Sequence, residues 1–126
     1  MRLSYASISL KNPRHPELAG MDVEALADTG AIMLCIPQHV AIQLKLDVIE
    51  QREVTTADGK KHLVDYAGPL QIGFGNRSSF GGALVLGDSV LLGAIQMEDM
   101  DLVVIPREQR VAVNPESPNI PTAIVK

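Results

Sequence analysis

The sequence has few aromatic residues and almost no cysteine. Phe, Tyr and Trp together make up 3% of its 126 residues, Trp is absent, and Cys35 is the single cysteine. A core built from this composition must be aliphatic, and an internal disulfide is excluded because it needs two cysteines. Cys35 lies in an apolar run, so we expect a buried core thiol and not a nucleophile.

Long apolar runs and clusters of like charge are also missing. No apolar segment approaches the roughly 20 residues of a membrane-spanning helix, and the N-terminal residues alternate in polarity, unlike a signal peptide. The net charge is −4, from 11 basic and 15 acidic residues. The basic run Lys60–His62 is too short for a nucleic-acid footprint. We therefore expect a soluble cytoplasmic protein that binds neither membranes nor nucleic acids.

Short alternating segments predict a β-rich chain. With 46% hydrophobic residues, residues 1–126 are expected to form one domain with its own core. Strands are expected over Leu3–Leu10, Met21–Ala27, Met33–Ile36, Glu53–Ala57, Lys61–Tyr66, Leu70–Phe74, Phe80–Leu86, Val90–Leu92, Leu102–Ile105 and Val111–Val113. This pattern is typical of a small closed β-barrel.

Turn and helix signals complete the prediction. Asp58-Gly59 is a favoured two-residue hairpin turn, a second hairpin is expected at Gly75–Arg77, and Pro69 should interrupt the strands. Short helices are expected over Gln38–Leu46, with Pro37 at the first helical position, and over Ala94–Met100.

One carboxylate lies inside the apolar run from Ala25 to Ile36. An isolated ionised Asp is costly to bury, so Asp28 either has a partner or sits at a turn that points it into a cleft. Thr29 and Gly30 favour the turn, because Thr brings a hydroxyl that bonds locally and Gly admits a tight backbone.

The segment Leu26–Ala31 resembles the active-site loop of the retroviral-type (retropepsin-like) aspartic proteases, a family with single-domain bacterial and cellular members. An apolar strand precedes the Asp-Thr-Gly, an apolar run follows Ala31, and a hairpin candidate lies downstream. Leu91-Leu92-Gly93, ahead of a helical stretch, is similar to the family's second motif. The resemblance spans roughly Leu3–Val113 and implies an all-β acid-protease barrel with one or two short helices.

The resemblance implies an aspartic endopeptidase, a hydrolase in which Asp28 is catalytic. Thr29 would brace the loop through its hydroxyl, and Gly30 would let the substrate backbone approach. The same resemblance makes Ala31, Leu92 and Gly93 supports of the loop, and Asp58 and Gly59 a flap over a peptide or protein substrate. It implies no cofactor and no metal, because the nucleophile is water, and His15, His39 and His62 lack metal-ligand spacing.

The chemistry needs two carboxylates that share one proton. No other Asp is followed by Thr-Gly or Ser-Gly, and the chain is too short for the two-lobed form of the family. A symmetric homodimer would bring Asp28 against its own copy. We therefore expect a homodimer with half a site in each chain.

Alternatives stay open for each part of this site. Asp28 can be a turn residue without chemistry, and Asp58-Gly59 a plain surface turn. The whole chain can be a non-catalytic dimeric peptide-binding or scaffold module, which the single glycine at the hairpin tip favours and the intact Asp-Thr-Gly opposes. Ile32 and Ala94 stand where retroviral members often carry an acidic residue and an Arg that form an ion pair.

Overall fold

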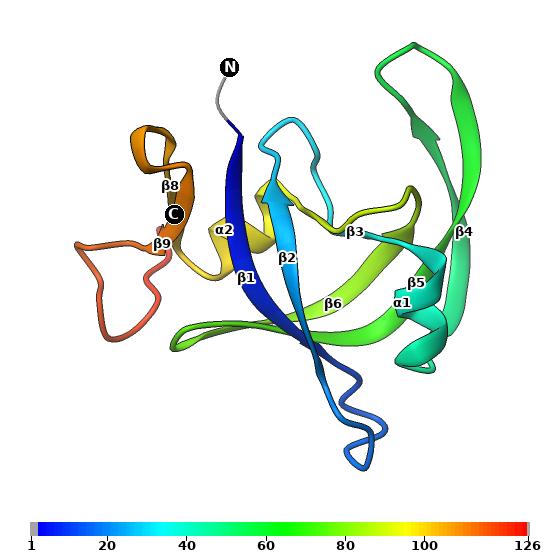
Figure 1. Ribbon diagram of the computed structural model, residues 1–126, viewed down its shortest axis with the longest axis horizontal. Coiled ribbons are helices and arrows are strands. Elements are labelled where there is room, and N and C mark those ends of the chain that lie inside the picture. Colours follow the sequence, from blue (N-terminus) through cyan, green and yellow to red (C-terminus); the bar gives the residue numbers. More distant parts are fainter. Residues whose placement is uncertain (1–2, 126) are drawn as a thin grey trace.

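The computed structural model describes residues 3–125, in which strands dominate (Figure 1). The strands are β1 Ser4–Lys11, β2 Met21–Ala27, β3 Cys35–Ile36, β4 Asp47–Thr55, β5 Lys61–Phe74, β6 Arg77–Val85, β7 Leu91–Leu92, β8 Leu102–Ile105 and β9 Arg110–Val113. The helices are α1 Gln38–Gln43, α2 Ala94–Asp99 and the 3₁₀ turn η1 Pro106–Glu108. Within the described residues, none of these helices is long and apolar enough to cross a membrane.

The strands form one sheet that closes on itself. Their order is β4-β5-β6-β3-β7-β2-β1-β9-β8, and β5 also pairs with β1 through Ser9–Gly73 and Leu10–Ile72. This second pairing closes a ring in the order β1-β5-β6-β3-β7-β2, with β4 and the β8–β9 pair outside it. The expected all-β closed barrel with two short α-helices is confirmed.

The barrel encloses an aliphatic core, as the composition predicts. Every second residue of β1 points inward, so Ala6, Ile8 and Leu10 are buried while their neighbours are more exposed. The core continues through residues of the other elements, among them Ala25, Leu34, Ile36, Val40, Leu44, Leu70, Ile72, Ala83, Val90, Leu92, Met97, Met100 and Val111. Cys35 is 5% exposed, which confirms the buried thiol.

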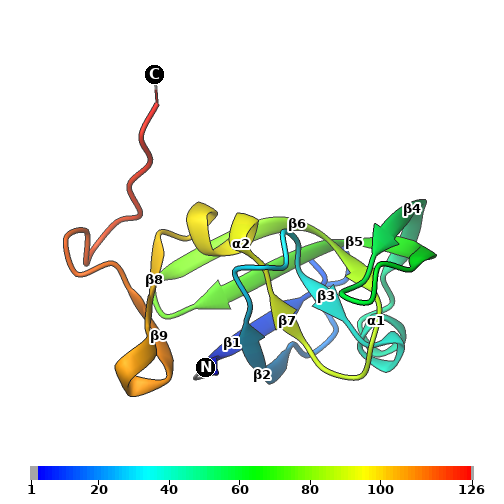
Figure 2. The same ribbon diagram turned by 90° about the horizontal axis from the view of Figure 1, so that it is seen from above.

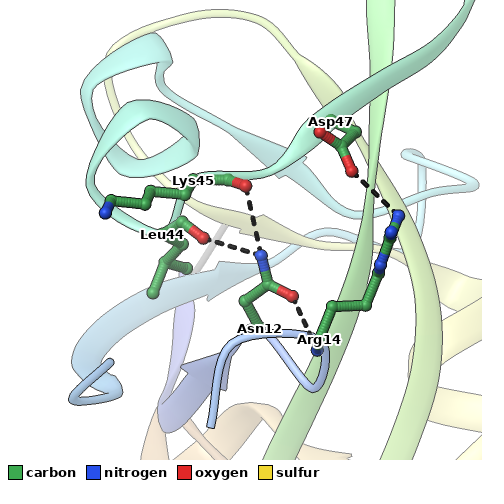
Figure 3. Close-up of polar contacts among 5 residues, drawn as sticks. All are labelled: Asn12, Arg14, Leu44, Lys45 and Asp47. Carbon is green, nitrogen blue, oxygen red and sulfur yellow. Dashed lines mark hydrogen bonds and ion pairs between the residues drawn. The ribbon is translucent and has the colours of Figure 1, made fainter. Parts of the chain in front are cut away.

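Helix α1 is shorter than the sequence predicts, and its end is capped from a distant loop. Pro37 is the extended N-cap residue, not the first helical one, and the helix ends at Gln43 instead of Leu46. Lys45 adopts a left-handed φ of 52°, which stops the helix. The buried Asn12 amide donates to the carbonyls of Leu44 (2.8 Å) and Lys45 (3.2 Å), as Figure 3 shows. These bonds satisfy carbonyls that a helix end leaves free.

Replacing Asn12 should destabilise the fold. Asn12→Ala leaves the Leu44 carbonyl without its partner in a buried position, so we expect the free energy of unfolding to fall by about 1–3 kcal/mol. The control is Arg14→Ala, which removes an exposed ion pair to Asp47 (3.0 Å; Figure 3) and should cost at most about 1 kcal/mol. Urea denaturation of both variants checks this, and equal effects would contradict the capping role.

Pro69 does not interrupt β5, contrary to the sequence-based prediction. The strand runs without a break from Lys61 to Phe74, and its register with β6 shifts between Ala67 and Leu70. Pro69 therefore lies in an irregular position where the ladder does not need its missing N–H.

The C-terminal segment is held against the barrel before it extends away from it (Figure 2). Arg77, 1% exposed, donates through Nη2 to the Ser117 carbonyl, and Asn76 donates to the Pro118 carbonyl (3.0 Å). The Asp101 carboxylate accepts bonds from the Ser117 hydroxyl and the Thr122 N–H, and these bonds lower the pKa of Asp101. Residues 123–125 are exposed.

Candidate active site

The Asp-Thr-Gly loop follows directly from the pairing of two strands. β2 and β7 run parallel with Leu26 opposite Leu91, and the Asp28 N–H continues the ladder by donating to the Leu92 carbonyl (3.0 Å). The two sequence motifs therefore lie side by side. Because Asp28 is the first residue after β2, the hydrogen bonds between β2 and β7 fix the position of its backbone.

A tight turn orients the Asp28 carboxylate. The Ala31 N–H donates to the Asp28 carbonyl (3.1 Å), and the Gly30 N–H donates to Asp28 Oδ1 (2.9 Å). Asp28 is half-buried, whereas Thr29 and Gly30 are exposed. The Thr29 hydroxyl has no hydrogen-bond partner within residues 3–125. One carboxylate oxygen is thus bound by the backbone, and within residues 3–125 no hydrogen bond occupies the other.

The second motif supports this turn at very close range. A Cβ at Gly93 would lie 2.6 Å from the Met33 carbonyl carbon and 2.7 Å from the Ile32 oxygen, so only glycine fits there. The Ala94 N–H donates to the Ala31 carbonyl (2.9 Å), and Leu92 is fully buried. Leu92 and Gly93 therefore lie directly against the loop and the residues that follow it, and Ala31 within the loop is bonded to Ala94.

A cleft of about 650 Å³ opens beside Asp28. Its volume lies within the range of ligand pockets, which is about 300–1,000 Å³. Its walls are mostly aliphatic, and among the described residues Asp28 is the only carboxylate that lines it. The lining residues are Asp28, Gly30, Ala31, Ile32, Met33, Cys35, Val54, Thr55, Thr56, Ala57, Leu84, Leu86 and Leu91.

The β4–β5 hairpin forms the wall opposite the loop and projects beyond the barrel (Figure 1). Thr55, Thr56 and Ala57 line the cleft, whereas Asp58 and Gly59, the residues predicted from the sequence, lie at the tip and do not. The lining residues are consecutive, so the alternation of side chains along a strand could not have identified them from the sequence.

The hairpin turn is longer than the predicted two residues. The Thr56 N–H bonds the Lys60 carbonyl (2.9 Å), the Gly59 N–H bonds the Thr56 carbonyl (2.8 Å), and Gly59 has a φ of 82°. Asp58 Oδ1 accepts bonds from the Thr56 hydroxyl (2.6 Å) and the Lys60 N–H (3.0 Å). These bonds, chiefly that of Thr56, lower the pKa of Asp58. Asp58 thus fixes the shape of the tip.

Removing the Thr56 hydroxyl should raise the pKa of Asp58 toward its ordinary value. The ionised carboxylate accepts this bond, so its contribution to the tip is present above the ordinary Asp pKa and is lost as the pH falls through the lowered one. Carbon-13 NMR titration of the carboxyl group in Thr56→Val measures the change. Thr55→Val is the matched control and should leave the titration unchanged; an unchanged pKa in Thr56→Val would refute the assignment.

Cys35 is in the cleft wall but is not activated. Burial raises the pKa of the Cys35 thiol, and the Asp28 carboxylate raises it further. The neutral thiol is a poor nucleophile. Within residues 3–125, no group of three or more His, Cys, Asp or Glu side chains is placed to hold a metal ion.

Comparison with known proteins identifies the architecture. No described protein family and no curated protein matches the sequence. Among solved structures, the chain is similar to the retroviral protease-like domain of Ddi1 from Leishmania major, with a TM-score of 0.55 and 11% identity over 89% of this chain and 90% of that one. The closed barrel, the two short helices and this likeness together show that the chain has the retropepsin-like fold.

Proposed function

We propose that this chain is an aspartic endopeptidase that acts as a homodimer, with one Asp28 from each copy. The observation that carries the proposal is the position of Asp28: it is the only carboxylate lining an aliphatic cleft in a retropepsin-like barrel. A single carboxylate provides half of the acid–base pair that peptide hydrolysis by water needs. A symmetric copy supplies the other half.

In the proposed mechanism the two Asp28 carboxyl groups share one proton. Two carboxyl groups this close cannot both be ionised, because their like charges would repel each other. The ionised group takes a proton from water, whose oxygen bonds to the scissile carbonyl carbon. The protonated group gives its proton to the carbonyl oxygen. Collapse of the tetrahedral intermediate breaks the C–N bond: the protonated carboxyl gives its proton to the leaving amine, and the ionised one takes a proton from a hydroxyl of the intermediate, which becomes the product carboxylic acid and restores the shared proton.

The neighbouring residues hold the pair in place. The Gly30 N–H fixes Oδ1 of Asp28 and leaves the other oxygen for water or the partner carboxyl. Thr29, exposed and without a hydroxyl partner in the described chain, is proposed to brace the loop across the dimer. Ala31, Leu92 and Gly93 support the loop from within the barrel.

The cleft supports an extended peptide with aliphatic side chains as the substrate. Its wall contains Met33, Val54, Leu84 and Leu86 and no aromatic residue. Digestion of an unfolded protein, followed by mass spectrometry of the products, tests the proposal. Cleavage of the unfolded protein that a statine peptide inhibits would support the proposal. If the chain is shown to be a dimer and the unfolded protein still remains intact, the proposal is contradicted.

A binding module without turnover is the second candidate. The hairpin tip favours it, because Asp58 ties the tip together and Gly59 is its single glycine. Such a tip is less mobile than a glycine-rich flap. Binding of a statine peptide without any cleavage would favour this candidate.

The hairpin is proposed to close over the bound peptide. Lids of this kind become ordered on closure, so amide hydrogen exchange across residues 55–63 should slow when a statine peptide binds. The β8–β9 pair does not line the cleft and serves as the internal control. Unchanged exchange across residues 55–63 with bound inhibitor would show that the hairpin is only a surface turn.

A further inference from the structure

Arg52 lies at one edge of the cleft, next to two residues that line it. Arg52 and Val54 are half-buried while their neighbours on β4 are exposed, so both side chains point to the same face of the strand. Val54 lines the cleft. Arg52 Nη1 donates to Sδ of Met33 (3.3 Å), a lining residue that follows the Asp28 loop. The guanidinium therefore lies where β4 meets the segment after this loop.

Three contacts hold this guanidinium in one orientation. It stacks on the Tyr66 ring, 3.8 Å from the ring centroid, and its Nε donates to the Glu50 carboxylate (2.9 Å). The bond from Nη1 to Met33 is the third contact. Gly82 leaves room for the ring, because a Cβ there would lie 2.5 Å from Cζ of Tyr66. An arginine that is already ordered loses less conformational freedom when it binds a ligand.

Part of the guanidinium is available to a ligand. The Arg52 side chain is 38% exposed, and within residues 3–125 its Nη2 donates no hydrogen bond. The ion pair with Glu50 is exposed and therefore weak, so it does not exclude a second acceptor. A guanidinium has five N–H donors, and its planar fork matches the geometry of a carboxylate.

The lining of the cleft provides no cation of its own. Among the described residues that line it, none is Lys, Arg or His. An ionised side chain of a bound peptide would be costly to place against the aliphatic walls without a partner. Beside Arg52 the same carboxylate would have one. The cleft therefore favours an acidic residue at one position of the peptide and disfavours it at the others.

We propose that Arg52 is a specificity-determining residue that binds the carboxylate of an Asp or Glu side chain in the substrate. The inference rests on the proposed function, since that function places an extended peptide in the cleft. It adds the substrate class: peptides with aliphatic residues along the cleft and one acidic residue where the peptide passes Arg52. Because the contact is an exposed charge pair, its contribution to binding should decrease as the salt concentration rises.

Isothermal titration calorimetry of the full chain with statine peptides tests this contact. The peptides are aliphatic, acetylated and amidated, and a single Glu or Gln is moved through their positions, so that the Glu side chain is the only carboxylate. At one position the Glu peptide should bind about tenfold more tightly than the Gln peptide, as expected for a hydrogen bond to a charged group. In Arg52→Gln the two peptides should bind equally.

Arg110→Gln is the matched control. Arg110 on β9 is also half-exposed and also pairs through Nε with a Glu two residues earlier, Glu108 (2.7 Å), but it lies away from the cleft. This variant should keep the preference for Glu. Arg52→Glu should reverse it, so that a Lys peptide binds more tightly than the Glu peptide, which a merely structural role of Arg52 does not predict. Circular dichroism confirms that the variants are folded.

Several outcomes would overturn the inference. One is equal binding of the Glu and Gln peptides at every position by the wild type, a comparison that needs no variant. Another is a preference for Glu that persists in Arg52→Gln, and a third is a preference that Arg110→Gln abolishes as well.

The readout separates this inference from the proposed function, because calorimetry does not depend on catalysis. A chain that binds the Glu peptide more tightly through Arg52 but cleaves nothing supports the inference and contradicts the peptidase. A chain that cleaves unfolded protein, with the same frequency of Asp and Glu around the cleavage sites of the wild type and of Arg52→Gln, contradicts the inference alone.

Discussion

Asp28→Asn is expected to lower kcat for peptide hydrolysis by about 10⁴-fold, the upper end of what general acid–base catalysis contributes. The substitution removes both proton-transfer groups of the dimer at once, because each protomer carries the same change. Asn keeps the shape of the side chain and can still accept the Gly30 N–H bond, so the fold and the dimer should persist. Initial rates on a fluorogenic peptide measure the loss.

Asp22→Asn is the matched control for this substitution. Asp22 is an exposed residue of the same strand, β2, and its substitution removes the same charge from the chain. Its rate should equal that of the wild type. If Asp28→Asn retained wild-type turnover while sedimenting as a folded dimer, Asp28 would not be the catalytic residue.

Dilution is expected to abolish activity per molecule. In the proposed homodimer a monomer holds half a site, so mass action removes the competent dimer below its dissociation constant. Well below that constant, each tenfold dilution should reduce the specific activity about tenfold. Rates and sedimentation are measured on the same samples, and constant specific activity in a monomeric sample would refute the shared site.

Mixing subunits provides an independent check of the shared site. An excess of Asp28→Asn subunits converts wild-type dimers into mixed dimers, which contain one carboxylate and should be inactive. Activity at a fixed wild-type concentration should therefore fall as the variant is added, whereas adding Asp22→Asn, which is expected to be active itself, should raise the total activity. Full activity at high excess would show that each chain works alone.

Local patterns were enough to predict strands such as β1 and β2 and the loop that carries Asp28, whereas β4 begins at Asp47 and not at the predicted Glu53. Alternating residues in β1 set its buried face, and the segment Leu26–Ala31 set the end of β2 together with the turn. In these places each residue's structure depends on its sequence neighbours and on the simple choice between core and solvent. The barrel and the location of the candidate site followed from them.

Features that depend on distant residues could not be predicted in this way. Helix α1 ends early because Asn12, far away in sequence, caps it and because Lys45 takes a left-handed conformation. Pro69 stays within a strand because the neighbouring β6 shifts its register there. The cleft lining shows the same limit: Leu84 and Val54 meet beside Asp28 only after the sheet has closed.

The pairing of β1 with β5 also determines how the chain reaches its native state. Ser9 pairs with Gly73, so the ring closes by a contact between segments far apart in sequence. Such contacts require a large loss of chain entropy before they stabilise anything, and proteins dominated by them fold in about milliseconds to seconds. During synthesis, β1 leaves the ribosome long before its partner exists. Until then one edge of this strand, with Ile8 and Leu10 on its apolar face, is open to pairing with other chains, so we expect early release and crowding to promote aggregation.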